Sequence, residues 1–284
     1  MLTQIKAGVL LSYLTLFLGN IISFLYTPFM LRLMGQSEYG LYTLSTSIIG
    51  CLGIMEFGLG NALIRNVAEY RALNDRESQY RLYGMYFIIY LLIAILVTIA
   101  GSYLVLNIGA FFARTLSQDE IMKAKIIMSL MVLNLALSLP FSVFSSAILA
   151  YERFVFSKTI QLLYTLLNPM IMIPLLLMGY RSVEMAIVGT CFAILSIVVN
   201  TYYCFKVLKI KLYFAKFDRV ILKKNMTYAF SVFLAIIFDK VFWSSNPFVL
   251  GLTSGTISVA IYSIGASFST YYMSLGGAIT GLFL

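Results

Sequence analysis

The stretch Gly35–Asn66 reads GQSEYGLYTLSTSIIGCLGIMEFGLGNALIRN. The order of its polar and apolar residues is the starting point for predicting the fold. A short polar turn at Gly35 precedes an apolar run that is long enough to cross a bilayer, since about 20 apolar residues suffice. The run ends at an acid and a glycine cluster, EFGLG, and Arg65 then opens a charged segment. This order predicts two membrane-spanning helices joined by a tight turn.

The whole chain has the composition of a membrane protein. Of its 284 residues, 61% are hydrophobic and 11% are charged, whereas a soluble domain carries about 25% charged residues. The mean hydropathy is +0.93. We therefore predict an all-α integral membrane protein with about eight transmembrane helices, at 7–32, 40–64, 82–106, 124–150, 160–179, 185–205, 226–250 and 257–284.

The distribution of lysine and arginine predicts the orientation. Fourteen of these 20 residues flank one side of the predicted spans, mostly in the segments 65–81 and 206–225, and five flank the other side. Positive charge accumulates in cytoplasmic loops. The N-terminus and both charged segments are therefore predicted to be cytoplasmic.

The segment 206–225 is the longest polar interruption and carries seven basic residues. Basic, partly apolar segments of this kind lie in the headgroup layer. We predict an N-terminal six-helix lobe at 1–205, a basic cytoplasmic linker at 206–225, and an incomplete second lobe of two helices at 226–284. A weak internal repeat supports this division, because a shift of 220 residues superposes Gly35 on Gly255, Tyr42 on Tyr262 and Ser47 on Ser267.

The sequence gives no support for an enzyme. Histidine is absent, and the three cysteines lie in apolar runs without the spacing of metal ligands. Serines are frequent, but no base is placed to activate one as a nucleophile. We therefore predict no catalytic residues, no metal site and no cofactor.

Polar and ionisable residues inside a membrane are costly and are candidates for function. Asp239 and Lys240 lie near the middle of a predicted span, and Trp243 and Asn246 share a helical face with Asp239. This face is predicted to line a cavity, with a buried structural ion pair as the alternative.

The predicted spans at 7–32 and 40–64 carry further candidates. Asn20 and Tyr26 belong to a polar region of the first span, which is either a cavity surface or a helix-packing surface. Glu56 lies among glycines about two-thirds of the way along the second span. It is a candidate for ion coupling or for tight helix packing.

Several short motifs, by their order and spacing together, point to a family: LMG at 33–35, EYGLY at 38–42, EFGLG at 56–60 with Ala62 and Arg65, DKVFW at 239–243, NPFVLG at 246–251 and VAIYS at 259–263. Through these motifs the chain resembles the Wzx-like flippases of O-antigen and capsule repeat units, in the multidrug/oligosaccharidyl-lipid/polysaccharide exporter superfamily. Members have a second complete lobe, whereas this chain ends inside its eighth predicted span, so we expect a truncated product. Asn246 also stands where many relatives have an acid.

The resemblance implies that an undecaprenyl-pyrophosphate-linked oligosaccharide is flipped across the bacterial inner membrane between two rocking lobes. Lys240 would complement the pyrophosphate, while Asp239 would balance charge or couple an ion. The implied partners are this lipid-linked substrate, membrane lipids and a polysaccharide polymerase complex, with no nucleic acid. The residues implied to contact sugar are Asn20, Tyr26, Trp243 and Asn246.

Three other functions remain open. A drug/cation antiporter and a peptidoglycan-precursor flippase belong to the same superfamily. A membrane-embedded polysaccharide polymerase or ligase would be an enzyme, and such enzymes carry a large external loop. The longest predicted external loop here spans 107–123, which disfavours that alternative.

Overall fold

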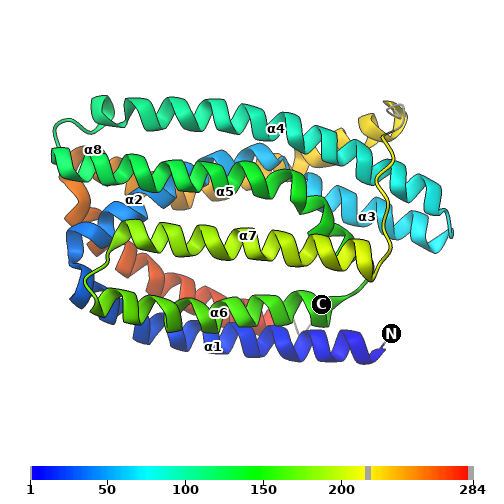
Figure 1. Cartoon of the computed structure of the whole chain (residues 1–284), viewed down its shortest axis with the longest axis horizontal. Helices are drawn as coiled ribbons and strands as arrows, with labels where there is room; N and C mark the ends of the chain where they lie inside the picture. The colour runs from blue at the N-terminus through cyan, green and yellow to red at the C-terminus, as the bar shows by residue number, and fades with distance from the viewer. Residues whose placement is uncertain (1, 215–218, 281–284) are drawn as a thin grey trace.

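Helices form the bundle seen in the computed structural model, which describes residues 2–214 and 219–280 (Figure 1). Seven segments of the described chain are long and apolar enough to cross a membrane, which confirms the predicted all-α membrane fold. The regular elements are α1 (Leu2–Met34), α2 (Gln36–Leu52), the 3₁₀ turn η1 (Gly53–Glu56), α3 (Leu59–Ala72), α4 (Arg76–Phe111), α5 (Gln118–Ala150), α6 (Phe154–Leu177), α7 (Ser182–Lys206) and α8 (Arg219–Thr280).

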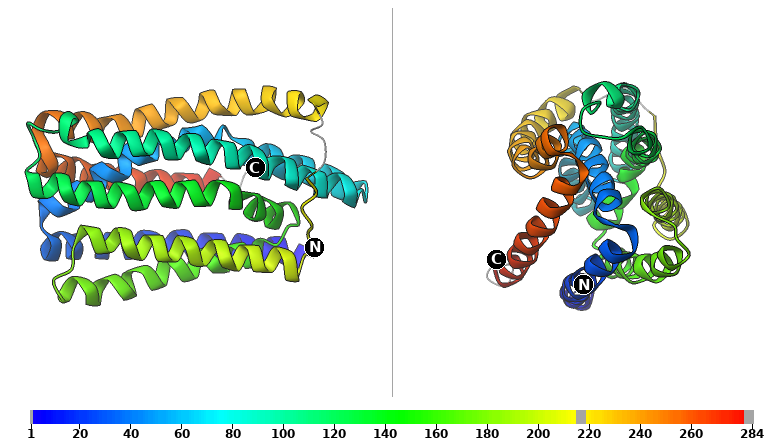
Figure 2. Two further views of the ribbon diagram at one scale, coloured as in Figure 1. Left: turned by 45° about the horizontal axis from the view of Figure 1, so that its top comes forward. Right: turned by 90° about the vertical axis from the view of Figure 1, so that its left-hand side faces the viewer.

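The long helices lie side by side, and their connections gather at two ends of the bundle (Figures 1 and 2). We call one end the Gly35 end, where the α1–α2, α4–α5 and α6–α7 turns lie. The opposite end is the Asp75 end, with the α3–α4 and α5–α6 turns. The principal packing pairs are α2 with α8, α4 with α5, α1 with α6, and α5 with α7.

A break at Gly255 divides α8 into two helices, which correspond to the predicted spans at 226–250 and 257–284. Gly255 has φ 80° and ψ −175°, and Gly35 has φ 88° and ψ 158°. Only glycine readily adopts this region of backbone conformation. The two positions superposed by the sequence repeat therefore make the same kind of turn, while the division into two lobes stays a prediction.

The predicted span at 40–64 lies within the membrane-length segment Gln36–Ala72, but its helix is interrupted near the centre. The chain leaves the α-helix at η1, and Phe57 (φ 55°) and Gly58 (φ 65°) are both left-handed before α3 begins. Glycine has a low helix propensity and enters the left-handed region without a steric penalty. Gly58, one of the glycines around Glu56, thus permits a break in the span.

The first part of the predicted linker crosses the surface of α4 as a strap without helical structure, residues 207–214. The Tyr213 amide donates to the Tyr80 carbonyl at 3.1 Å. A Cβ atom on Gly84 would lie 2.2 Å from the Tyr213 carbonyl oxygen, so glycine is required for this approach. The rest of the linker to residue 218 lies outside the described residues.

The start of α4, at the Asp75 end of the bundle, is capped by a polar side chain. Asp75 precedes α4, and its Oδ1 accepts from the Ser78 amide at 3.0 Å. Such a cap satisfies one of the free amides at a helix start. Hydrogen bonding from Ser78 lowers the pKa of Asp75.

Candidate functional site

A cavity of about 570 Å³ lies between α5, α6 and α7. Its lining is mainly apolar, as in most small-molecule sites. The polar members come from all three helices and carry hydroxyl or amide groups: Ser145, Ser157, Gln161, Tyr164, Ser196 and Asn200. None of the lining residues carries a charged side chain.

The polar and apolar groups of the cavity lie at different depths. Ser157, Gln161 and Asn200 fall within about 11 Å of the helix ends at the Asp75 end, at 1.5 Å per residue. Leu167 and Phe192 lie about 20 Å from the same ends. The polar groups of the cavity are therefore concentrated towards one membrane face, and the lining is apolar further in.

Two contacts help to define the polar half. Asn200 Nδ2 donates to Ser145 Oγ at 3.4 Å, which links α7 to α5. Lys158 Nζ donates to Gln161 Oε1 at 3.2 Å. Hydroxyl and amide groups act as both donors and acceptors, so this half suits an uncharged ligand rich in hydroxyl groups.

A carboxylate cluster joins three helices at the Gly35 end. Glu120 Oε1 accepts from Ser37 Oγ of α2 at 2.5 Å and from Thr256 Oγ1 of α8 at 2.9 Å. Glu120 Oε2 accepts from the Ser117 amide at 2.9 Å in the capping box that starts α5. Glu120 therefore joins the starts of α2, α5 and the second half of α8.

A second carboxylate lies one residue beyond Ser37. Glu38 is buried, and its two oxygens accept from Lys123 Nζ of α5 and Ser182 Oγ of α7. A buried charge needs an opposite charge and hydrogen bonds to offset its lost hydration. These two carboxylates were not among the predicted site residues, although both stand at predicted turns.

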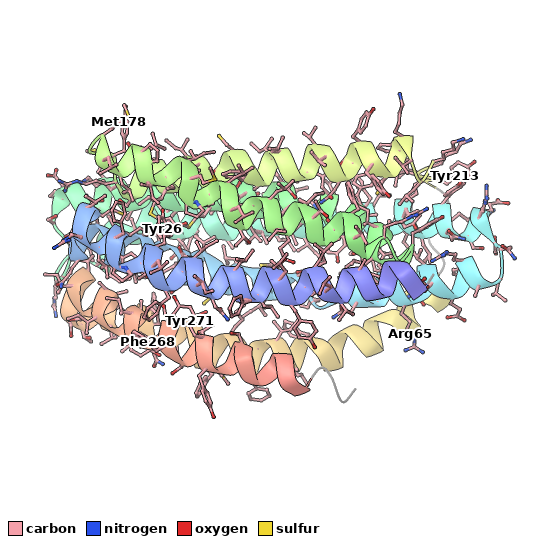
Figure 3. All side chains as sticks on the ribbon, turned by 90° about the horizontal axis from the view of Figure 1, so that it is seen from below. Tyr26, Arg65, Met178, Tyr213, Phe268 and Tyr271 are labelled. Atoms are coloured by element: carbon pink, nitrogen blue, oxygen red, sulfur yellow. The ribbon has the colours of Figure 1, made fainter. Side chains whose placement is uncertain are left out.

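Asn20 and Tyr26 lie on α1, which packs between α6 and the second half of α8 (Figure 3). Asn20 Nδ2 donates to Ser274 Oγ of α8 at 2.7 Å. The phenol oxygen of Tyr26 is buried and has no hydrogen-bond partner among the described residues. Asn20 thus contributes to contact between two helices, and sugar binding by either residue stays a prediction.

The candidates on α8 are only partly described. Lys240 is half-buried, while the side chains of Asp239 and Trp243 lie outside the described residues. Asn246 is exposed, and its Nδ2 donates to the Tyr262 hydroxyl at 2.7 Å across the Gly255 break. The proposed roles of these four residues therefore stay predictions.

Glu56 ends η1, where the second span is broken. A Cβ atom on Gly60 would lie 3.3 Å from Glu56 Oε1, 3.6 Å from Ser146 Oγ and 3.6 Å from the Tyr90 hydroxyl. The carboxylate therefore shares a small space with hydroxyl groups of α4 and α5. This arrangement is separate from the cavity, and the choice between ion coupling and packing stays open.

The cavity could not be predicted from the sequence, because its polar groups come from three helices. Ser157, Gln161 and Tyr164 are spaced by four and three residues, as are residues on one helical face. Ser196 and Asn200 have the same relation on α7. These spacings can be seen in the sequence, but the sequence does not show which helical faces lie opposite one another.

Comparison with known proteins identifies a family. Residues 5–282 match the model of a family described as polysaccharide biosynthesis protein. No curated protein matches the sequence.

Several solved structures have a similar fold. A chain described as protein A matches with a TM-score of 0.76 at 12% identity, over 96% of this chain and 61% of that one. A MOP superfamily transporter from Pyrococcus furiosus matches with a TM-score of 0.62 at 14% identity, over 96% and 64%. An inward-facing MATE family multidrug transporter of the same superfamily gives 0.60 at 16% identity, over 90% and 64%.

These matches show a shared fold, that of the MOP superfamily transporters, at identities too low to carry function. The chain spans less than two thirds of the length of these three structures. Its helices therefore correspond to one large part of a MOP-type bundle.

Proposed function

Because this chain belongs to the polysaccharide biosynthesis protein family, we propose that it acts in flipping undecaprenyl-pyrophosphate-linked oligosaccharide repeat units across the bacterial inner membrane. The flipping is of the Wzx type, by alternating access, and supplies O-antigen, capsule or exopolysaccharide biosynthesis. A pyrophosphate–sugar headgroup cannot cross hydrocarbon unaided, since each buried polar group without a partner costs several kcal/mol, roughly 2–7 by one range of estimates. A transporter must therefore offer the headgroup a polar path.

The observation that carries the proposal is the cavity between α5, α6 and α7. Its volume of about 570 Å³ falls in the range of about 300–1,000 Å³ for ligand pockets. Its hydroxyl and amide groups match the donors and acceptors of a sugar, and Tyr164 and Phe192 add aromatic surface. With the N-terminus in the cytoplasm, the polar half of the cavity would face the side on which lipid-linked sugars are made.

The remaining candidates have roles in the same proposal. Lys240 complements the pyrophosphate, and Asp239 balances charge or couples an ion. A different arrangement of the two lobes during the transport cycle brings the sugar into contact with four further residues: Asn20, Tyr26, Trp243 and Asn246. The substrate and membrane lipids are the direct partners, and a polysaccharide polymerase complex receives the product.

A drug/cation antiporter is the principal rival. Such a protein binds cations, and a cation site favours carboxylates, whereas no lining residue of the cavity is acidic. A peptidoglycan-precursor flippase would recognise the same chemistry of sugar and pyrophosphate. The experiment must therefore compare substrates as well as detect movement.

The test is translocation by the purified full chain in proteoliposomes. The substrate is a fluorescent polyprenyl-pyrophosphoryl oligosaccharide, and its accessibility to a membrane-impermeant quencher is followed with time. We expect faster translocation than in protein-free vesicles, and slower translocation by Asn200→Leu, which removes an amide from the cavity. Asn107→Leu is the matched control, because Asn107 is half-buried on α4, does not line the cavity, and donates to the Tyr103 carbonyl.

Two results would reject the proposal. One is translocation no faster than in protein-free vesicles for every lipid-linked saccharide tested. The other is saturable transport of a cationic drug with no effect of lipid-linked saccharides. Faster transport of the peptidoglycan precursor than of repeat units would instead assign the chain to the rival flippase class.

A further inference from the structure

Lys158 lies next to the cavity between α5, α6 and α7. It lies on the first turns of α6, about 6 Å along the helix from Phe154, at 1.5 Å per residue. Its ammonium donates to Gln161 Oε1 at 3.2 Å, and Gln161 lines the cavity together with Ser157. The hydrogen bond therefore holds the positive charge beside a residue that lines the cavity.

No acidic side chain of the described residues forms an ion pair with this charge. Among the residues that the structure describes, the ion pairs are Arg71–Glu152, Arg81–Glu77 and Lys123–Glu38, and none includes Lys158. No acidic residue lines the cavity. An ammonium has three donors, and one of them is used by Gln161, so donors remain for anionic oxygens beside the cavity.

The position of the Lys158 charge beside the polar lining indicates which chemical groups a ligand of the cavity must have. The half-buried Lys158 lies beside the cavity. The uncharged groups of Ser157, Gln161 and Asn200 line it. A ligand that satisfies both has an anionic group attached directly to a neutral, hydroxyl-rich group. Phosphate esters of sugars and of other polyols have this arrangement, and a lysine binds phosphate as a point charge.

We propose that the cavity is a binding site for a phosphorylated glycosyl or polyol headgroup, with its phosphate on Lys158 and its uncharged part against Gln161 and Asn200. This inference rests on the proposed function for its physiological ligand, a lipid-linked sugar pyrophosphate. The same chemistry is present in phosphatidylglycerol, whose headgroup is a second source. The site is distinct from Lys240, which lies on α8 and does not line this cavity.

The experiment measures binding by the full chain in nanodiscs of phosphatidylcholine. The ligands are a short-chain prenyl-pyrophosphoryl N-acetylhexosamine, the phosphate-free prenyl glycoside of the same sugar, and inorganic pyrophosphate. Dissociation constants are obtained for the wild type, Lys158→Gln and Lys158→Arg. Lys206→Gln is the matched control, since Lys206 is exposed at the same end of the bundle and contacts the Tyr202 ring.

We expect Lys158→Gln to weaken binding of the pyrophosphoryl sugar about tenfold or more, the loss expected for one charge-assisted hydrogen bond. Binding of the phosphate-free glycoside should be unchanged. Lys158→Arg should retain affinity within about threefold, and Lys206→Gln should match the wild type. Inorganic pyrophosphate should bind more weakly than the sugar ester, because it leaves the cavity empty.

The two sources of phosphate are separated by competition. Displacement of the pyrophosphoryl sugar by phosphatidylglycerol, lost in Lys158→Gln, would support the site and assign it to a phospholipid headgroup. Unchanged affinity of Lys158→Gln for the pyrophosphoryl sugar would overturn the proposal, as would an equal loss for the phosphate-free glycoside. Because this assay measures binding, a chain that binds at Lys158 but does not translocate would refute the proposed function and leave this site standing.

Discussion

The hydroxyl oxygens of Ser37 and Thr256 lie 3.2 Å apart, although the two residues start different helices. Both hydroxyls donate to the same oxygen of Glu120, so α2 and the second half of α8 are held together at the Gly35 end. The packing beside this contact is close, because a Cβ atom on Gly40 would lie 1.9 Å from the Thr256 carbonyl oxygen. In an alternating-access cycle, this end must separate whenever the transporter opens there.

A disulfide between these positions should therefore trap the chain with this end closed. We expect Ser37→Cys/Thr256→Cys to cross-link under mild oxidation, since the hydroxyls it replaces are in contact and disulfides need Cβ atoms about 3.5–4.5 Å apart. The background lacks Cys51, Cys191 and Cys204. Translocation in proteoliposomes should fall at least about tenfold on oxidation and return on reduction.

The single variant Ser37→Cys provides the control, because oxidation cannot cross-link it within the chain. A cross-linked double variant that translocates as fast as its reduced form would show that the Gly35 end does not need to open at Ser37 and Thr256.

Gly40 should be intolerant of even a methyl group. Gly40→Ala places a Cβ against backbone atoms of Thr256, which cannot move without shifting α8. We expect a loss of about 1–3 kcal/mol of stability, the usual cost of overpacking. Denaturant unfolding of the detergent-solubilised chain measures it.

Gly50→Ala is the matched control in the same helix. Nothing lies within 4 Å of a Cβ on Gly50, and alanine is favoured over glycine in a helix by about 1 kcal/mol. The control should therefore be neutral or stabilising. Equal destabilisation of both variants would contradict close packing at Gly40.

The Glu38–Lys123 ion pair should contribute to stability through its buried partner. The Glu38 side chain is 10% exposed and the Lys123 side chain 41% exposed. Among the described residues, Lys123→Met leaves the Glu38 carboxylate with Ser182 as its hydrogen-bond donor. We expect the free energy of unfolding to fall by about 2 kcal/mol, which is less than the roughly 3–5 kcal/mol for a fully buried pair because Lys123 is partly hydrated. The double variant with Glu38→Gln should lose less than the sum of the two single variants.

Glu77 and Arg81 supply the comparison, because this ion pair on α4 has side chains 65% and 58% exposed. Exposed pairs couple by less than about 1 kcal/mol. A double-mutant cycle with the same coupling energy for both pairs would argue against burial as the source of the Glu38 effect.

Lys240 is expected to act on the pyrophosphate during translocation. Lys240→Gln should slow transport of a pyrophosphate-linked oligosaccharide about tenfold, the loss expected for one charge-assisted hydrogen bond. Lys125→Gln, at an exposed position of α5, should transport at the wild-type rate. Wild-type rates for Lys240→Gln and for a variant of Asp239 would remove both residues from the proposed mechanism.

The approximate positions of the membrane-spanning segments could be predicted from the sequence, because crossing a bilayer requires long apolar segments. The turns at Gly35 and Gly255 could also be predicted, since glycine marks both and both have the same backbone conformation. The break at Phe57 and Gly58 could not, because a glycine in an apolar helix is equally consistent with close packing. Only the dihedral angles distinguish the two.

Contacts between helices were beyond prediction for a different reason. Glu120 and Glu38 looked like residues of polar turns, and their partners come from distant parts of the chain. Ser145 lies in the predicted span at 124–150, but its neighbours in the cavity depend on how α6 and α7 are rotated. The periodicity of a sequence shows which residues share one face of a helix. It does not show which helix packs against that face.

The contact between Ser37 and Thr256 also has a consequence for biosynthesis. The two residues are 219 positions apart, so at about 5–20 residues per second the ribosome needs roughly 11–44 s to deliver the second after the first. During that interval Gly40 and the hydroxyl of Ser37 have no partner from α8. The newly made α2 must therefore be sheltered by lipid, by the insertion machinery or by a chaperone until the last helices arrive.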